Sequence, residues 1–303
     1  MRSTTVLLSG VTGMLGGRIA HHLLATAGVA LRLLVRPAAL GEPGKRAELD
    51  RLAGRGAEVV AGDVADPASL ARATRGVDVV VSALQGGREA IVDGQLALAR
   101  AAAANGVRRI LPSDFALDLF KAPPGELPPF DLRREADAAI AAMGLEHIHV
   151  LNGAFLDALA SGAGTVAFDD EAGTATFWGT GEERFDATTV DDTARYAARV
   201  AVDRSIPSGK FAVAAQQLSL GDIVSAVERG RGRRYARRSR GTTGDLRAWI
   251  ADRRAAGEAT AAMYGTYQLY MLTGQTALDD LQNDRYPDIA PVTLARLPAE
   301  QAA

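Results

Sequence analysis

The chain has 303 residues, a formal net charge of −2, 48% hydrophobic residues and no cysteine. This length is enough for one large domain or two smaller ones, and the near-neutral charge gives no overall attraction to nucleic acid or anionic lipid. The absence of cysteine excludes disulfides, thiolate metal sites and a cysteine nucleophile.

The amino-terminal residues lead straight into an apolar run and lack the features of a signal peptide, which are a long apolar core and a small-residue cleavage site. No uninterrupted apolar stretch reaches the roughly 20 residues that cross a bilayer. We therefore expect a soluble, cytoplasmic protein.

Short apolar runs alternate with longer amphipathic stretches in the first half of the chain. The predicted strands are residues 6–8, 31–35, 58–61, 77–82, 108–111 and 148–151. The predicted helices are residues 16–25, a helix opened by Asp66 and Pro67, residues 92–104 and residues 133–143. This alternation favours an α/β fold of the Rossmann type, a doubly wound parallel sheet covered by helices on both faces.

The alternation weakens after residue 151. Short strands are expected at 175–178 and 211–213, and helices are expected to begin at Thr193, with Asp192 as the N-cap, and at Ile223. The arginine-rich stretch 229–240 has only one aromatic residue, which favours a solvated helix end over a nucleic-acid surface.

Two domains are expected from this pattern. The first is a Rossmann domain over residues 1–155, completed by about 185–213. The second is a smaller, mostly helical substrate domain made of residues 156–184 and 214–303.

The strongest motif, Gly10-Val-Thr-Gly13-Met-Leu-Gly16, follows the first predicted strand and opens the first predicted helix. Gly10 permits a tight turn, Gly13 lets the backbone approach a diphosphate, and Gly16 lets the helix pack on the sheet. The free N–H groups at the helix start would hold the anion. The turn therefore predicts cofactor contacts from Gly10, Thr12, Gly13, Met14, Leu15 and Gly16.

The end of the second strand favours NADP over NAD. An NAD-binding domain usually carries an acidic residue there, whereas this strand ends in Val35 and Arg36. The guanidinium of Arg36 is suited to a 2′-phosphate, and Lys45 is a second candidate for that contact.

Several other chemistries are not indicated. No tyrosine is followed four residues later by lysine, and no GxSxG segment occurs. The four histidines are expected in core or surface positions, and no grouping of His, Asp and Glu has metal-ligand spacing.

Taken together, these segments resemble the NmrA-like, or isoflavone-reductase-like, branch of the atypical short-chain dehydrogenases. The similar segments are the glycine turn with Arg36, residues 82–85, 111–115, 152–155 and 189–194. The resemblance implies an NADP(H) cofactor that also contacts Ser82, Ala83, Leu84, Gln85, Ser113, Asp114, Phe115, Asn152 and Phe155.

Reductases of this family use a lysine at the start of the helix after the loop that 111–115 resembles. Arg133 occupies that point here, and Lys121 is the nearby lysine that could replace it. Arginine stays charged and is a poor proton donor, although it can stabilise an oxyanion. It is left open whether Lys121, Arg133 or neither supports proton transfer.

The resemblance implies an NADP(H)-dependent reductase that transfers hydride to a small aromatic or polyketide-like carbonyl, enone or benzylic carbon. The expected substrate contacts are Asp114, Phe155, Met263, Tyr264 and Tyr267, with ordinary helix packing as the other explanation for the last three. The alternative is a non-catalytic NADP(H)-binding redox sensor. The expected partner is a small-molecule substrate, with a homodimer left open and neither nucleic acid nor membrane expected.

Overall fold

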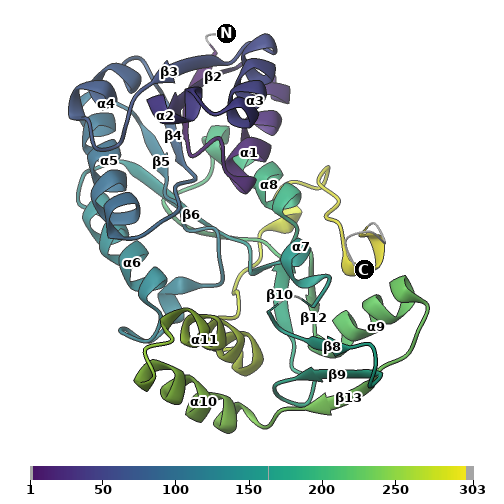
Figure 1. Ribbon diagram of the computed structural model, residues 1–303. Helices are drawn as coiled ribbons and strands as arrows, with labels where there is room; N and C mark the ends of the chain where they lie inside the picture. Colours follow the sequence, from purple (N-terminus) through teal and green to yellow (C-terminus); the bar gives the residue numbers. More distant parts are fainter. Residues whose placement is uncertain (1–2, 163, 298–303) are drawn as a thin grey trace. The chain divides into compact units, whose positions relative to one another are not determined.

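The computed structural model describes residues 3–162 and 164–297 (Figure 1). The chain divides into two compact units. Unit 1 contains the described residues up to Phe115 together with Asp131–Val150 and Thr193–Phe211, and unit 2 contains the remainder. By this division residues 116–130, 151–155, 185–192 and 212–213 lie in unit 2, and the domain bounds expected from the sequence stay a prediction.

Unit 1 is built on a seven-stranded sheet with the order β11-β6-β5-β4-β1-β2-β3. Its strands are β1 Thr4–Ser9, β2 Val29–Val35, β3 Glu58–Ala61, β4 Val79–Ser82, β5 Arg109–Leu111, β6 Glu146–Leu151 and β11 Gly209–Ala212. The pairings among β1 to β6 are all parallel. The order reverses between β1 and β4, which is the switch point where Rossmann sheets bind their ligands.

Helices cover both faces of this sheet (Figure 1). They are α1 Met14–Ala25, α2 Pro37–Leu40, α3 Pro43–Gly54, α4 Pro67–Ala73, α5 Gln95–Ala104, α6 Pro128–Ala141 and α8 Val190–Val202. Apolar side chains of α4, α5 and α6, such as Leu70, Leu98 and Ile140, form one buried cluster with strand residues Leu7 and Val80. Figure 1 shows α1 and α8 on the other side of the sheet. The predicted doubly wound fold is confirmed.

Local capping explains where two of the helices begin. Asp66 is the N-cap of α4, as predicted, and its Oδ1 accepts a hydrogen bond from the Ala68 amide at 3.0 Å. The prediction that Asp192 caps α8 is wrong, because that helix begins at Val190. Thr189 precedes the helix and its Oγ1 accepts from the Asp192 amide at 3.0 Å, while Asp192 Oδ2 accepts from the same hydroxyl. The hydroxyl of Thr189 thus accepts from a backbone N–H group of the first turn that has no partner within the helix. The helix therefore starts earlier than expected.

Unit 2 contains two three-stranded sheets with the orders β12-β10-β7 and β13-β9-β8. Its strands are β7 Ala154–Phe155, β8 Ala167–Asp169, β9 Thr174–Phe177, β10 Phe185–Thr188, β12 Gln216–Leu218 and β13 Ala236–Ser239. Its helices are α7 Leu156–Leu159, α9 Leu220–Arg231, α10 Thr243–Ala255 and α11 Ala259–Thr273. One apolar cluster, which includes Phe130, Phe177, Ile223 and Tyr270, fills this unit. Strand β13 lies within the stretch 229–240 and is exposed at every residue, so the expected solvated helix end accounts only for the part up to Arg231.

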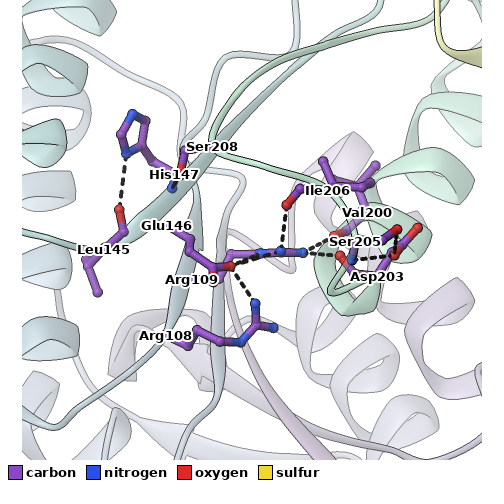
Figure 2. A network of polar contacts seen from close by, with 10 residues as sticks. All are labelled: Arg108, Arg109, Leu145, Glu146, His147, Val200, Asp203, Ser205, Ile206 and Ser208. Atoms are coloured by element: carbon purple, nitrogen blue, oxygen red, sulfur yellow. Dashed lines mark hydrogen bonds and ion pairs between the residues drawn. The ribbon is translucent and has the colours of Figure 1, made fainter.

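Figure 2 shows a polar network of unit 1 in which a fully buried arginine joins β5 to the segment after α8. The guanidinium of Arg109 donates to the carbonyls of Val200, Asp203 and Ile206 at 2.6–3.0 Å, and its Nε donates to Glu146 Oε2 at 2.9 Å. Burial lowers the pKa of Arg109, and the hydrogen bond to Glu146 opposes that shift. The arginine thereby satisfies carbonyls at the carboxyl end of α8 that lack intrahelical partners.

We expect Arg109→Ala to lower the free energy of unfolding by about 3–5 kcal/mol, because Glu146 and the carbonyls that Arg109 bonds lose their donor together. The matched control is Arg108→Ala, since Arg108 also pairs with Glu146 but its side chain is 27% exposed, and two of its nitrogens have no hydrogen-bond partner in the part of the chain that the structure describes. The control substitution should lower the free energy of unfolding by about 1 kcal/mol or less. Urea denaturation measures both, and equal losses would contradict a special role for Arg109.

Candidate nucleotide and hydride-transfer site

The glycine turn after β1 is shaped by backbone contacts that exclude side chains. Gly10 has φ +79°, and a Cβ built on it would lie 2.2 Å from the carbonyl oxygen of Ala83. A Cβ on Gly16 would lie 2.2 Å from the carbonyl oxygen of Gly10. Gly13 is the N-cap of α1 and offers no side-chain cap to the first N–H groups of the helix. This is the arrangement that a diphosphate requires at a helix N-terminus.

A cleft of about 360 Å³ opens beside this turn. It is lined by Val11, Thr12, Gly13, Met14, Gly17, Arg18, His21, Gly44, Lys45 and Glu48. Lys45 is half-buried and pairs with Glu42 at 2.6 Å, whereas Arg36 is exposed, heads α2 and lies outside the lining set. The predicted phosphate contacts of Arg36 and Lys45 stay predictions.

Six of the ten residues that line the cleft were not predicted from the sequence, and Arg18 and His21 are the two of them with polar side chains on α1. Arg18 and His21 follow Met14 at helical spacing, so all three share one face of α1. That spacing was the available signal. Met14 is 59% exposed, which is unusual for a large apolar side chain, and this exposure is visible only in the structure.

Ser113 joins the two predicted cofactor loops of unit 1. Its amide donates to Gln95 Oε1 at 2.8 Å, and its hydroxyl donates to the carbonyl of Leu84 at 2.7 Å. Its own carbonyl accepts from Arg133 Nε at 2.8 Å. The structure therefore brings the loops after β4 and β5 together with Arg133. In these loops Ser82 and Phe115 are buried and Gln85 is exposed.

Asp114 points into unit 1 and is fully buried. Its Oδ2 accepts from His149 Nδ1 at 2.7 Å, and Asp137 Oδ2 lies 3.8 Å from the same nitrogen. Burial raises the pKa of Asp137, the charge of Asp114 raises it further, and the charge of Arg133 lowers it. A substrate contact from the Asp114 carboxylate stays a prediction, and it would require this side chain to leave His149.

In unit 2, the segment after β6 holds two predicted site residues. The amide of Asn152 donates to the carbonyl of Ala116 at 3.0 Å, and its side chain is fully buried. Its Oδ1 has no hydrogen-bond partner among the described residues. Phe155 ends the short strand β7 and is half-buried. The predicted contacts of Asn152 and Phe155 with cofactor and substrate stay predictions.

Lys121 is engaged within unit 2. Its Nζ donates to the carbonyl of Ala277 at 2.6 Å and pairs with Asp279 at 2.7 Å. These two partners use two of the three N–H donors of the ammonium group.

The predicted substrate-wall residues on α11 also lie in unit 2, and they differ in exposure. Tyr267 packs edge-on against Phe130, with ring centroids 5.2 Å apart, and Met263 packs against the same apolar cluster. Tyr264 is 57% exposed. Helix packing therefore accounts for Met263 and Tyr267, while Tyr264 is the residue that packing leaves unexplained.

We expect Gly10→Ala to destabilise the protein by about 3 kcal/mol or more, because a methyl group would collide with the Ala83 carbonyl and a positive φ adds strain. Gly28→Ala is the matched control, since Gly28 has φ +76° but nothing within 4 Å of its built Cβ. Gly28→Ala should lower the free energy of unfolding by about 1–2 kcal/mol, through the strain of a positive φ alone. Chemical denaturation compares them, and equal losses would show that the approach of Ala83 is not tight.

Within residues 3–162 and 164–297, no helix is both long and apolar enough to span a membrane.

The chain matches the model of the NmrA-like family over residues 2–278. Pinoresinol reductase 2 of Arabidopsis thaliana is 37% identical over 159 residues, which is 50% of this chain and 50% of that protein. The matched part thus spans about half the length of that relative. Phenylcoumaran benzylic ether reductase POP1 of Populus trichocarpa is 28% identical over 246 residues, 78% of each chain.

Solved structures share the fold over nearly the whole chain. AtPrR2 with NADP+ and (+)pinoresinol superposes with a TM-score of 0.85 at 26% identity, covering 100% of this chain and 98% of that one. An isoflavone reductase superposes with a TM-score of 0.83 at 20% identity, covering 97% of this chain and 98% of that one, which shows likeness of fold. Since the family model covers most of the chain, this protein belongs to the NmrA-like family, as its motifs had indicated.

Proposed function

We propose that this chain is an NADPH-dependent reductase that delivers hydride to the benzylic carbon of a small aromatic substrate. The observation that carries the proposal is the likeness over the full length to AtPrR2, solved with NADP+ and (+)pinoresinol. Relatives named for pinoresinol and for phenylcoumaran benzylic ethers support a benzylic position over a simple ketone.

The residues of unit 1 fit the cofactor. The backbone of Gly10 lies against the carbonyl of Ala83, where a side chain would collide, and α1 begins just after Gly13 with N–H groups that would hold a diphosphate. Arg36 and Lys45 would pair with the 2′-phosphate, and no acidic residue ends β2 to favour NAD. When bound, the nicotinamide supplies the hydride.

Arg133 is the group that we propose to act on the substrate oxygen. Its hydrogen bond to the Ser113 carbonyl holds it beside the two cofactor loops, whereas the amine of Lys121 is occupied by Ala277 and Asp279. A guanidinium keeps its charge at every working pH, so its contribution is to orient the substrate and stabilise an oxygen anion. The proton that completes the reaction then comes from another source, such as water.

Phe155 and Tyr264 are the strongest candidates for apolar contacts with an aromatic substrate. Both are aromatic and not fully buried, and neither ring packs against another aromatic ring among the described residues. Asn152 would offer its buried amide to a polar atom of the cofactor or substrate.

Arg36→Ala is expected to weaken NADPH binding by about 1–3 kcal/mol through loss of a charge-assisted contact, with little change for NADH. The matched control is Arg46→Ala, because Arg46 is exposed on α3 and pairs with Asp50 at 2.8 Å. The control should bind NADPH like the unaltered protein. Calorimetric titration with both cofactors measures this, and equal losses for NADPH and NADH would refute recognition of the 2′-phosphate by Arg36.

Turnover is the direct test of the enzyme. The protein is incubated with NADPH and a panel of benzylic ethers, enones, aryl ketones and quinones, and the absorbance of the reduced nicotinamide is followed. Arg133→Ala should lower kcat by about 100-fold or more, because the anion loses its stabilising charge. Lys121→Ala should change kcat little.

Two outcomes would redirect the proposal. A loss confined to Lys121→Ala would assign the catalytic charge to Lys121. Tight binding of both NADP+ and NADPH, without consumption across the panel, would favour the redox sensor over the reductase.

A further inference from the structure

Residues 83–88, here called the strap, follow β4 at the carboxyl end of the sheet in unit 1. The strap begins beside the glycine turn, because a Cβ built on Gly10 would lie 2.2 Å from the carbonyl oxygen of Ala83. It ends at Arg88, which pairs with Glu135 on α6. The strap thus joins the turn that would hold the diphosphate to the helix that carries the proposed catalytic arginine.

Side-chain hydrogen bonds hold the strap at two points. Near its start, the hydroxyl of Ser113 donates to the carbonyl of Leu84 at 2.7 Å. At its end, Arg88 donates to both carboxylate oxygens of Glu135, at 2.6 and 2.5 Å. Residues 85–87 between these anchors are exposed, include two glycines, and make no side-chain hydrogen bond in the part of the chain that the structure describes. Breaking the second anchor would therefore leave this stretch able to move.

The ion pair of Arg88 and Glu135 has the geometry of a strong surface contact. The planar guanidinium matches the carboxylate with two N–H···O bonds, and each partner favours the charged form of the other, so that the pKa of Arg88 is raised and that of Glu135 is lowered. The side chains are 54% and 48% exposed. An exposed pair adds little to the stability of a fold, so the consequence of this one lies in the two elements that it links.

We propose that Arg88 and Glu135 are positioning residues that hold the strap closed beside bound NADPH and thereby slow its release, an inference that rests on the proposed reductase. The diphosphate would bind at the glycine turn, and the nicotinamide must reach Arg133 on α6. Because the strap joins the same two places, it lies along the path of the dinucleotide. Opening of such a loop limits ligand release in many enzymes.

The test measures how fast NADPH leaves the full chain. The protein is loaded with NADPH and mixed rapidly with excess NADP+, and the fluorescence of the reduced nicotinamide is followed. Glu135→Gln nearly keeps the side-chain volume and should raise the dissociation rate about five-fold, the upper end for an exposed pair. The KM for NADPH should rise with it, whereas kcat should not fall, because Arg133 keeps its hydrogen bond to Ser113.

A charge exchange separates the pairing from other effects of the substitutions. Arg88→Glu alone and Glu135→Arg alone each place two like charges together, so each should also speed release. The two substitutions combined restore an ion pair and should return the rate to within about two-fold of the unaltered protein. Arg46→Ala is the matched control, since Arg46 also belongs to an exposed ion pair but lies on α3, outside the strap. Its dissociation rate should equal that of the unaltered protein.

Salt gives a second readout. Raising the salt concentration from about 0.1 to about 1 M should speed release more in the unaltered protein than in Glu135→Gln, because only the former has this ion pair to be screened.

An unchanged dissociation rate in Glu135→Gln, a rate that stays raised in the double exchange, or equal salt dependence would overturn the role of the pair. Each of these results would leave NADPH binding, and with it the proposed reductase, standing. Absence of NADPH binding by the unaltered protein would refute both.

Discussion

The close contact between the turn after β1 and the backbone of Ala83 fixes the conformation of the sheet edge of unit 1 at which the nucleotide is expected to bind. It exists because β1 and β4 are neighbours in a parallel sheet, so that their carboxyl ends meet. Only glycine fits at position 10, and the carbonyl of Gly10 in turn excludes a side chain at position 16. The start of α1 is thereby held against the sheet with its N–H groups turned to solvent, where an anion can reach them.

The hydrogen bonds of Ser113 extend this constraint along the sheet. One residue ties the loop after β4, the buried Gln95 of α5 and Arg133 of α6 into a single arrangement. Gln95 comes directly after a π-helical turn, Glu89–Gly94, a rare feature that is often found near functional sites. The position of Arg133 therefore depends on a hydrogen-bonded network, in addition to its own place on a helix.

The sequence predicted what is local or periodic and missed what depends on distant contacts. The alternating strands, the glycine turn and the Asp66 cap are read within a few residues, and the structure confirms them. The buried cluster of Asp114, Asp137 and His149 was missed because the three residues are 23 and 12 positions apart, which matches no sequence motif, and only the adjacency of β5, β6 and α6 joins them. Strand β13 was missed because all its side chains are exposed, so it shows no apolar alternation.

In the proposed reductase, an arginine at position 133 changes which step of the reduction the protein would assist. A lysine can give up its proton when its surroundings lower its pKa, whereas a guanidinium cannot at any ordinary pH. A site built around Arg133 is therefore suited to a reaction whose critical charge is an oxygen anion that must be stabilised while hydride arrives at carbon. Reduction at a benzylic carbon with a departing aryl oxygen meets this condition, because the aryl oxygen is stable as an anion and can take its proton from water later. The same chemistry is less suited to a simple ketone, whose alkoxide product needs a proton as it forms.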